Sequence, residues 1–250
     1  MTAAFVVPRR DDRGPRDRLW RFCRDHWLTR MPDVPIVEGH DEGGVFNRSR
    51  ALNTARLGVP NGTGTLVILD SDSLVDPGQV RSAVDLSVET GQVVVGFGRW
   101  VGLNNGMTEK VLAGFRGSWE PGMRNLWEDS HSALVAVPAA LWDRVGGFDE
   151  RFSGWGLEDS AFVLACDIAA RQQPAYRPGA PRAHKTFRWP HEPHLRIDGD
   201  CWHLWHPRNE QARGAEREAN RPLFDRYQRA WNAPAGEDVA MLDRLIGERT

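Results

Sequence analysis

Thr65-Leu66-Val67-Ile68-Leu69-Asp70-Ser71-Asp72 is the stretch of this sequence that says most about its fold. Its first five residues are almost wholly apolar, which is typical of a parallel-sheet strand whose two faces are both covered. Two aspartates then end the apolar run. In parallel sheets, ligands bind at the carboxyl ends of the strands. The stretch therefore predicts a buried strand that ends at a ligand site.

Strands and helices are expected to alternate around this stretch. The other expected strands are residues 3–7, 34–38 and 93–97. Helices are expected to begin at Pro15, after the capping residue Asn47, and at Pro77 after the capping residue Asp76. Gly58 and Gly91 are placed to end the last two. This βαβα order predicts an α/β fold with a doubly wound, mostly parallel sheet.

The second half of the sequence is less regular. Residues 132–137 are strand-like, residues 138–145 are helical, and another helix is expected from Glu158. Residues 174–200 contain many prolines and no clear period, which predicts a long loop or lid. Residues 214–231 have the pattern of an amphipathic helix, and the tail after them is expected to be a docked or partly frayed helix.

Length, charge and cysteine content narrow the class of protein. A chain of 250 residues can form one catalytic domain of ordinary α/β size. Its formal net charge of -2 is spread along the sequence, which argues against a nucleic-acid partner and against a basic membrane-binding helix. Its three cysteines are far apart, as expected in a reducing compartment. No stretch is long enough to span a membrane, so we expect a cytoplasmic protein.

Asp70 and Asp72 form an Asp-x-Asp pair at the end of the predicted strand. Carboxylates are ligands that Mg²⁺ and Mn²⁺ prefer, and a histidine in the same site would shift the preference toward Mn²⁺. The alternative is that these aspartates only cap the following turn, because turns are rich in aspartate. The surrounding motifs must decide between the two interpretations.

A second candidate segment runs from Gly146 to Asp159, where a glycine-rich stretch meets a predicted helix. Glycines allow the backbone to approach a sugar closely, and Trp155 offers an apolar face to a pyranose ring. Glu158 or Asp159 could remove the proton of an acceptor hydroxyl group. The alternative is that both carboxylates are ordinary first-turn residues, favoured there by the helix dipole.

A third candidate segment contains His203 and His206, three residues apart among large aromatic residues. Either imidazole could bind a metal ion. The alternative is a pair of packed histidines that hydrogen-bond to the backbone. If Cys201 joined them, zinc would be conceivable, but this group is too small for a closed structural zinc site.

Five segments, taken in order, resemble the GT-A glycosyltransferases related to beta-1,4-galactosyltransferases and polypeptide N-acetylgalactosaminyltransferases. The resemblance covers roughly residues 3–207. It is carried by Val6-Val7-Pro8-Arg9-Arg10, by Val45-Phe46-Asn47-Arg48 with Ala51-Leu52-Asn53, by Asp70-Ser71-Asp72, by the block from Gly146-Gly147-Phe148-Asp149 to Trp155-Gly156-Leu157-Glu158-Asp159, and by His203-x-x-His206.

This resemblance implies a fold and a function. The fold would be GT-A, with a Rossmann-like central sheet and a small second sheet near the active site. Residues 1–213 would form the catalytic domain, with a nucleotide-binding half to about residue 100 and an acceptor and metal half after it. Residues 214–250 would be a helical extension. The reaction would be metal-dependent transfer of a sugar from a nucleoside diphosphate, a UDP-sugar being expected, to a glycan, protein or small-molecule acceptor.

The resemblance also implies roles for individual residues, with Mn²⁺ or Mg²⁺ as the cofactor. The residues expected to bind the nucleotide sugar are Pro8, Arg10, Phe46, Arg48, Asp70, Ser71 and Asp72. Arg13 remains an alternative to Arg10. The expected metal ligands are Asp72 and His206, with Asp70 and His203 as further candidates. Trp155, Gly156 and Glu158 would hold the sugar and the acceptor. Asp159 would be the general base of an inverting enzyme, with Glu158 beside it.

Other functions remain possible for these motifs. A sugar nucleotidyltransferase also uses metal-binding aspartates, but the glycine-rich phosphate loop that it places after its first strand is absent here. A metal-dependent phosphoesterase would leave the block around Trp155 without a role. A carbohydrate-binding or nucleotide-sugar-binding protein without catalytic activity could keep the same fold.

Overall fold

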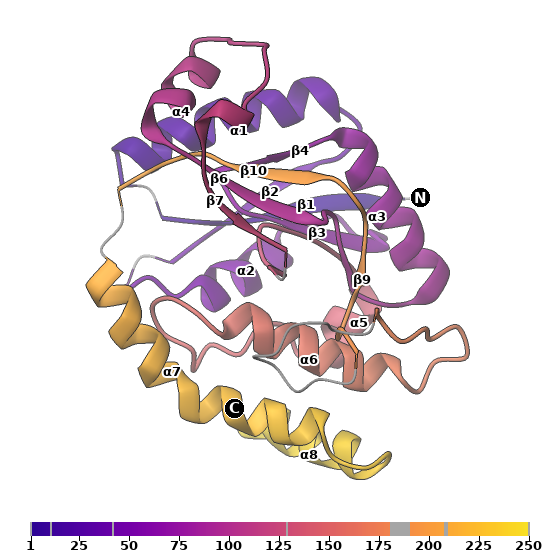
Figure 1. Cartoon of the computed structure of the whole chain (residues 1–250). Helices are drawn as coiled ribbons and strands as arrows, with labels where there is room; N and C mark the ends of the chain where they lie inside the picture. Colours follow the sequence, from indigo (N-terminus) through magenta and orange to yellow (C-terminus); the bar gives the residue numbers. More distant parts are fainter. Residues whose placement is uncertain are drawn as a thin grey trace.

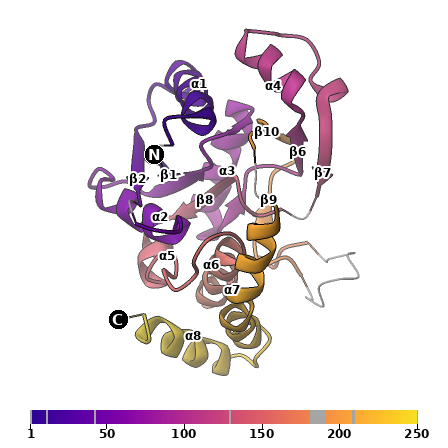
Figure 2. The same ribbon diagram turned by 90° about the vertical axis from the view of Figure 1, so that its left-hand side faces the viewer.

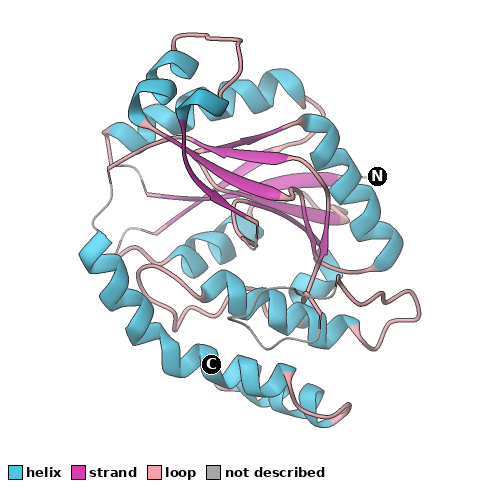
Figure 3. Ribbon diagram, viewed as in Figure 1, coloured by secondary structure: helices cyan, strands magenta, loops and turns pink. Residues whose placement is uncertain are grey.

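The computed structural model describes residues 2–10, 12–41, 43–128, 130–180, 191–207 and 210–249. These residues form a central mixed sheet, a smaller second sheet and helices on both sides (Figure 1). Figure 3 shows the same arrangement by type of secondary structure. None of the helices in the described ranges combines the length and the apolar character needed to cross a membrane.

The central sheet has the strand order β2-β1-β3-β8-β5-β9. Its strands are β1 (Ala3–Arg9), β2 (Ile36–His40), β3 (Thr65–Leu69), β5 (Val94–Val95), β8 (Leu134–Pro138) and β9 (Leu195–Arg196). Only β8 runs antiparallel to its neighbours in the described sheet. All five residues of β3 are buried, as the apolar run predicted.

The first three strands create a topological switch point. The chain passes from β1 to β2 on one side and then to β3 on the other side of β1. Its connections are α1 (Pro15–Arg30) and α2 (Arg48–Leu57), which lie on opposite faces of the sheet (Figure 1). The chain therefore leaves the carboxyl ends of the neighbouring strands β1 and β3 toward opposite sides of the sheet. Folds of this type bind ligands at such a point.

The sequence determines where these helices begin, end and pack. Pro15 opens α1, which buries Leu19, Trp20, Cys23 and Trp27 on one face. The Trp27 ring packs on Phe5 of β1, with ring centroids 5.1 Å apart. Asn47 caps α2 by accepting a hydrogen bond from the backbone of Arg50 at 2.9 Å.

The helix after β3 follows the predicted pattern. Asp76 caps α3 (Pro77–Thr90), and Gly91 ends it in the left-handed conformation. The helix packs on β3, β5 and β8.

The second sheet has the order β4-β10-β6-β7 and brings distant parts of the chain together. Its strands are β4 (Ser73–Val75), β10 (Asp200–His203), β6 (Arg99–Leu103) and β7 (Met123–Trp127). The short helices α4 (Asn105–Leu112) and η1 (Glu120–Gly122) lie between β6 and β7. Because β4 follows β3 directly, this sheet adjoins the carboxyl end of β3.

The remaining helices form a layer on the side of the central sheet opposite to α1 and α3 (Figure 1). They are α5 (Ala139–Arg144), α6 (Glu158–Ala170), α7 (Glu210–Trp231) and α8 (Glu237–Gly247). Helices α7 and α8 pack on α6 and on each other. Figure 2 shows α8 at the end of the molecule opposite to α4.

The α/β class and the mostly parallel central sheet are confirmed, whereas several boundaries differ from expectation. The second strand begins at Ile36 rather than Val34, and the fourth predicted strand is reduced to Val94–Val95. Within the expected loop 174–200, β9 and the start of β10 form strands. Residues 181–190, with the loop candidates His184 and Lys185, lie outside the described residues.

Candidate active site

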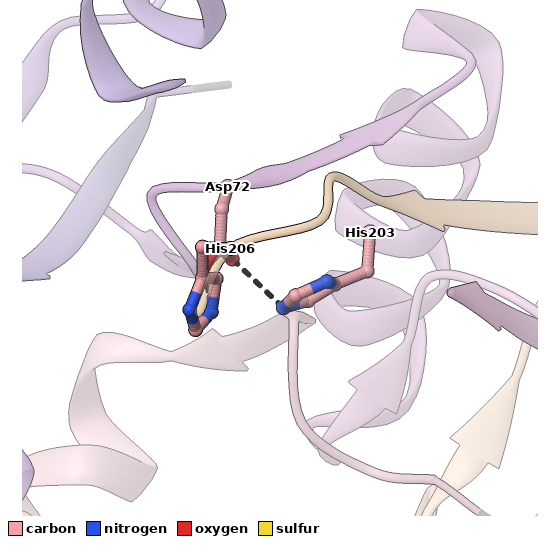
Figure 4. Close-up of side chains that lie close together, drawn as sticks. All are labelled: Asp72, His203 and His206. Atoms are coloured by element: carbon pink, nitrogen blue, oxygen red, sulfur yellow. Dashed lines mark ion pairs between the residues drawn. The ribbon is translucent and has the colours of Figure 1, made fainter. Parts of the chain in front are cut away.

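Asp72, His203 and His206 form a buried cluster between the two sheets. Asp72 lies in the turn between β3 and β4, and His203 ends β10 opposite Ser73 of β4. The backbone N–H of Leu204 donates to the carbonyl of Asp72 at 2.8 Å, which holds the segment with His206 beside the turn. Side-chain ligand atoms of the three residues lie within 4.8 Å of one another. Figure 4 shows the three side chains pointing toward one another.

The carboxylate of Asp72 faces both imidazoles. Its Oδ1 lies 3.3 Å from Nε2 of His203, and its Oδ2 lies 3.2 Å from Nε2 of His206. Burial alone would raise the pKa of Asp72, but the two histidines and, more weakly, Arg16 hold this pKa well below its usual range. Asp72 is therefore a carboxylate at any pH near neutrality.

The donor set fits a divalent cation. Nδ1 of His206 lies 2.9 Å from the carbonyl oxygen of Pro207, which can only accept a hydrogen bond. In a neutral His206 the proton is therefore on Nδ1, and Nε2 presents a lone pair to the Asp72 carboxylate. Two acceptors at 3.2 Å repel each other unless a proton or a cation lies between them. A metal-binding histidine commonly has its other ring nitrogen fixed in this way.

Asp70 lies apart from the cluster and pairs with Arg48. Its Oδ1 accepts a hydrogen bond from Nη2 of Arg48 at 2.7 Å. Nη1 of Arg48 lies 3.8 Å from Oε1 of Glu158. Burial would lower the pKa of Arg48, but the carboxylates of Asp70, Glu158 and Asp159 raise it instead. Arg48 thus joins the end of β3 to the start of α6.

Two buried atoms in this network have no hydrogen-bond partner among the described residues. They are Nη1 of Arg48, a donor, and Oε2 of Glu158, an acceptor. Both residues line the pocket described below. Buried polar groups normally have hydrogen-bond partners. A bound molecule with hydroxyl groups could supply the hydrogen bonds that these two atoms lack.

Glu158 and Asp159 occupy the first turn of α6. Burial raises the pKa of Glu158 to about 7, and the neighbouring charge of Asp159 adds to this effect. Oδ1 of Asp159 accepts a hydrogen bond from the backbone of Ser160 at 2.8 Å. The carboxyl group of Glu158 is therefore partly protonated near neutral pH, and it is more buried than that of Asp159.

The glycine-rich turn before α6 is held by its neighbours. Gly146 and Gly147 have φ values of 69° and 67°, which glycine adopts readily. The amide of Asn53 on α2 donates to the carbonyl of Phe148 at 2.9 Å and accepts from its N–H at 3.0 Å. This turn leads into the segment that carries Trp155.

Helix α7 covers the segment around Trp155. The backbone N–H of Trp155 donates to Glu216 at 2.8 Å, and the guanidinium of Arg213 lies 3.7 Å from the centre of the Trp155 ring. One face of this ring is therefore already covered by a cation. The carbonyl of Gly156 accepts a hydrogen bond from Asn220 at 2.9 Å.

These groups surround one pocket of about 450 Å³, a volume typical of small-molecule sites. All but one of the predicted site residues line it. They are Pro8, Arg10, Phe46, Arg48, Asp70, Ser71, Asp72, Trp155, Glu158, Asp159, His203 and His206. The exception is Gly156. Arg10 donates to the carbonyls of Gly43 and Gly44, while its alternative Arg13 is not in the pocket wall.

Other residues in the wall were not predicted. They are Arg9, Asp12, Arg16, Val45, Ser132, Gly154, Pro207, Ala212, Arg213 and Glu216. Arg9, Val45 and Gly154 belong to the quoted segments but were given no role there, and Asp12 and Pro207 lie close to such segments. Nothing in the sequence of α7 indicates that Arg213 and Glu216 reach a site formed by the ends of β1 and β3.

One family model matches the chain, and it covers part of the site. Residues 117–166 match the model described as the N-terminal domain of galactosyltransferase. The matched segment includes β8, the glycine-rich turn, Glu158 and Asp159. It confirms the predicted resemblance to the galactosyltransferase group. A search of curated proteins finds no match.

The chain also matches solved structures. Two structures of Drosophila beta-1,4-galactosyltransferase 7 share 16% identity with this chain, with TM-scores of 0.44 and 0.45. One contains manganese, UDP-Gal and xylobiose, and the other contains xylobiose. The similarity covers 69% of this chain but only 63% of theirs, so this chain spans less than two thirds of their length.

Two further structures are more distant. A glycosyltransferase involved in glycosylation of the major capsid of PBCV-1 is 13% identical, with a TM-score of 0.37 over 88% of this chain and 98% of that one. A protein described as a glucose-1-phosphate thymidylyltransferase from Bacillus anthracis is 7% identical, with a TM-score of 0.36 over 87% and 96%. Similarity at this level assigns no reaction to this chain.

Proposed function

We propose that this protein is a metal-dependent glycosyltransferase that transfers a sugar from a nucleoside diphosphate, most simply a UDP-sugar, to a hydroxyl group of an acceptor. One observation carries the proposal. A single pocket of about 450 Å³ combines the Asp72–His203–His206 cluster with the carboxylates of Glu158 and Asp159. The match of residues 117–166 to a galactosyltransferase family model supports it.

The donor half of the pocket lies at the switch point of the central sheet. Pro8, Arg10, Phe46 and Ser71 line it from the ends of β1 and β3 and from the start of α2. Asp72, His203 and His206 would hold a divalent cation, Mn²⁺ or Mg²⁺. When bound, such a cation neutralises the negative charge that develops on the leaving diphosphate. Asp70 fixes Arg48 in place through its 2.7 Å hydrogen bond.

The acceptor half lies at the start of α6. In the proposed step, the acceptor oxygen forms a bond to the anomeric carbon of the donor sugar as the bond from that carbon to the diphosphate oxygen breaks. The proton of the acceptor hydroxyl passes to the carboxylate of Asp159, and the nucleoside diphosphate leaves with the bonding electrons. Attack from the face opposite the leaving group inverts the anomeric configuration.

We infer that Glu158 binds the substrate beside Asp159. Its carboxyl group is buried, and burial raises its pKa to about 7. Oε2 of Glu158 and Nη1 of Arg48, which have no hydrogen-bond partner in the described part of the chain, offer one acceptor and one donor. A sugar hydroxyl group can both donate and accept, so these two atoms would position a hydroxyl group of the substrate.

A reducing, cytoplasmic location is also proposed. Cys23, Cys166 and Cys201 are buried and free. Burial raises the pKa of each thiol well above its usual value, so all three are protonated and unreactive at neutral pH. Their state agrees with a compartment in which disulfides do not form.

The test is release of nucleoside diphosphate from a panel of UDP- and GDP-sugars, with Mn²⁺, with Mg²⁺ and with EDTA. We expect release that needs a metal ion and that is lost in Asp72→Ala. Pyrophosphate release from a nucleoside triphosphate would instead identify a nucleotidyltransferase. If no donor is turned over and no nucleotide binds in a metal-dependent way, the proposed function is wrong.

A further inference from the structure

Five arginines line the pocket, and three of them are held by other groups of the protein. Arg9 pairs with Asp17 at 2.9 Å and with Glu38 at 3.4 Å. Arg48 pairs with Asp70 at 2.7 Å. Arg10 donates to backbone carbonyls of Gly43 and Gly44 at 2.9 and 2.7 Å.

The fourth arginine, Arg213, lies over the Trp155 ring at 3.7 Å. It comes from α7 and covers the side of the pocket formed by the segment before α6. Because the guanidinium group of Arg213 stacks on Trp155, its positive charge stays at that wall. It would have to leave the Trp155 ring to contact a ligand at the metal cluster.

Arg16 differs from these four residues. It is the second residue of α1, is exposed, and lines the pocket. No described residue lies at hydrogen-bond or ion-pair distance from its guanidinium group. An arginine side chain that lines a pocket and forms no ion pair with the described residues can bind an anionic group of a ligand.

Arg16 lines the same pocket as Asp72, His203 and His206. A donor diphosphate that contacts a cation at this cluster would therefore lie in the pocket whose wall includes Arg16. Placed there, a guanidinium group can donate two parallel hydrogen bonds to phosphate oxygens.

The backbone at the start of α1 is already occupied. The carboxylate of Asp12 accepts hydrogen bonds from the N–H groups of Gly14, Arg16 and Asp17 at 2.8, 3.3 and 3.2 Å. These contacts lower the pKa of Asp12 although its partial burial opposes them. The carboxylate of Asp12 thus occupies the backbone N–H groups at the start of α1. At this helix end, the Arg16 side chain is the group that could bind a ligand in the pocket.

We propose that Arg16 binds the diphosphate of the donor, beside the Asp72–His203–His206 cluster, and that it is therefore a substrate-binding residue of this enzyme. The inference rests on the proposed function. Negative charge builds on the diphosphate as the bond to the sugar breaks, so a guanidinium group bound to the diphosphate contributes more in the transition state than in the bound donor. Arg16 would thus affect both donor affinity and turnover.

The experiment is calorimetric titration of UDP, UMP and uridine, with GDP, GMP and guanosine in parallel, into wild-type protein, Arg16→Gln and Arg16→Lys. Each titration is made with Mn²⁺ and again with EDTA. Arg21→Gln is the matched control, because Arg21 is also on α1, is 72% exposed and is not part of the pocket wall. Thermal melting of each variant checks that it is folded.

We expect Arg16→Gln to weaken binding of the diphosphate roughly 10- to 100-fold. Binding of the nucleoside should stay within about 2-fold. Arg16→Lys should recover part of the loss, since it keeps the charge without the planar fork. Part of the loss should persist in EDTA, where the metal ion makes no contribution.

Three results would overturn the inference. Equal diphosphate affinity in wild type and Arg16→Gln would show that Arg16 makes no contact. An equal loss for nucleoside and diphosphate would assign Arg16 to the base or to the shape of the pocket. Failure of the wild-type protein to bind any of these nucleotides would overturn the proposed function and this inference with it, and is distinguished from the first two by the wild-type titration.

Discussion

Asp159 lines the pocket at the first turn of α6, within the segment that matches the galactosyltransferase family model. Replacing it by asparagine keeps its size and removes its ability to accept a proton. We expect Asp159→Asn to slow sugar transfer by roughly 10²- to 10⁴-fold. Nucleoside diphosphate affinity, measured by calorimetry, should change little.

The control for this change is Asp143→Asn. Asp143 is 56% exposed, pairs with Arg56 and is outside the pocket, so its replacement should leave transfer unaffected. Unchanged transfer in Asp159→Asn would contradict the role of general base. The anomeric configuration of the product, followed by NMR, tests inversion separately, and retention of the donor configuration would rule it out.

Glu158 makes stability depend on pH. Its pKa is raised above its ordinary value of 4.5 to about 7 by burial and by Asp159, although Arg48 opposes this shift. The folded state therefore binds a proton more tightly than the unfolded state, and its stability falls as pH rises from 4.5 to 7. The shift corresponds to up to about 3 kcal/mol. Above pH 7 the loss is complete.

Glu158→Gln should remove this dependence. We expect the variant to gain up to about 3 kcal/mol relative to wild type between pH 4.5 and pH 8, measured by urea denaturation at several pH values. Glu218→Gln, at a position 74% exposed, is the control and should show no such trend. A constant difference between Glu158→Gln and wild type across this range would show that the carboxyl group has an ordinary pKa.

Among the elements, the turn between α5 and α6 has the most specific geometry. A Cβ atom added at Gly147 would lie 2.5 Å from Oδ1 of Asn53 and 3.0 Å from Nε1 of Trp142, at a φ of 67°. We expect Gly147→Ala to lower the free energy of unfolding by about 2–4 kcal/mol, from backbone strain and crowding together. Urea denaturation measures this change.

Gly62→Ala separates the two causes. Gly62 has a φ of 82° but nothing within 4 Å of an added Cβ atom. Its replacement should cost only the backbone term, about 1–2 kcal/mol. If Gly147→Ala costs no more than Gly62→Ala, the contacts of Asn53 do not make the turn rigid.

The elements also show what the sequence could and could not predict. Caps such as Asn47 and Asp76, and the apolar run of β3, are local signals, and each is confirmed. The resemblance implied a small second sheet, and the structure contains one. Its strands were not located in the sequence because they are short and gain their hydrogen bonds from distant partners. β4 has three residues, and its register with β10 depends on residues 201–203, which are far from it in the sequence.

The candidate site was more predictable than the fold around it. Residue type and spacing made Asp72, His203, His206, Glu158 and Asp159 candidates, the family resemblance implied their roles, and the structure brings them to one pocket. The contribution of α7 was not predictable. An amphipathic pattern indicates which face of a helix is apolar, but not which neighbour it covers. The expected role of Trp155 as an open sugar platform is limited by Arg213, which occupies one of its faces.

At the scale of the whole molecule, the C-terminal helices hold the site segment in place. The predicted boundary between residues 213 and 214 falls inside α7, which begins at Glu210, so the division there stays a prediction. Arg249, just after α8, donates to the carbonyls of Val145, Gly146 and Gly147 at 2.8, 3.2 and 3.1 Å. The end of the chain is thus bonded to the turn that leads to Asp159.

Replacing Arg249 tests this coupling. Arg249→Ala removes the hydrogen bonds that the Arg249 guanidinium group donates to three carbonyls and to the Tyr227 hydroxyl. We therefore expect the free energy of unfolding to fall by about 2–4 kcal/mol. Arg244→Ala, an exposed residue on α8, should change it by less than about 0.5 kcal/mol. Equal, small losses in the two variants would show that the C-terminal helices are independent of the turn.

The Asp72–His203–His206 cluster joins two segments about half the chain length apart. A cation held there would act as a reversible cross-link between the turn after β3 and the last strand of the second sheet. Because the three ligands come together only in the folded chain, binding would add to stability by mass action, about 2.7 kcal/mol at a hundred times the dissociation constant. The melting temperature would then depend on metal occupancy, and a chelator would lower the stability of the protein as well as its activity.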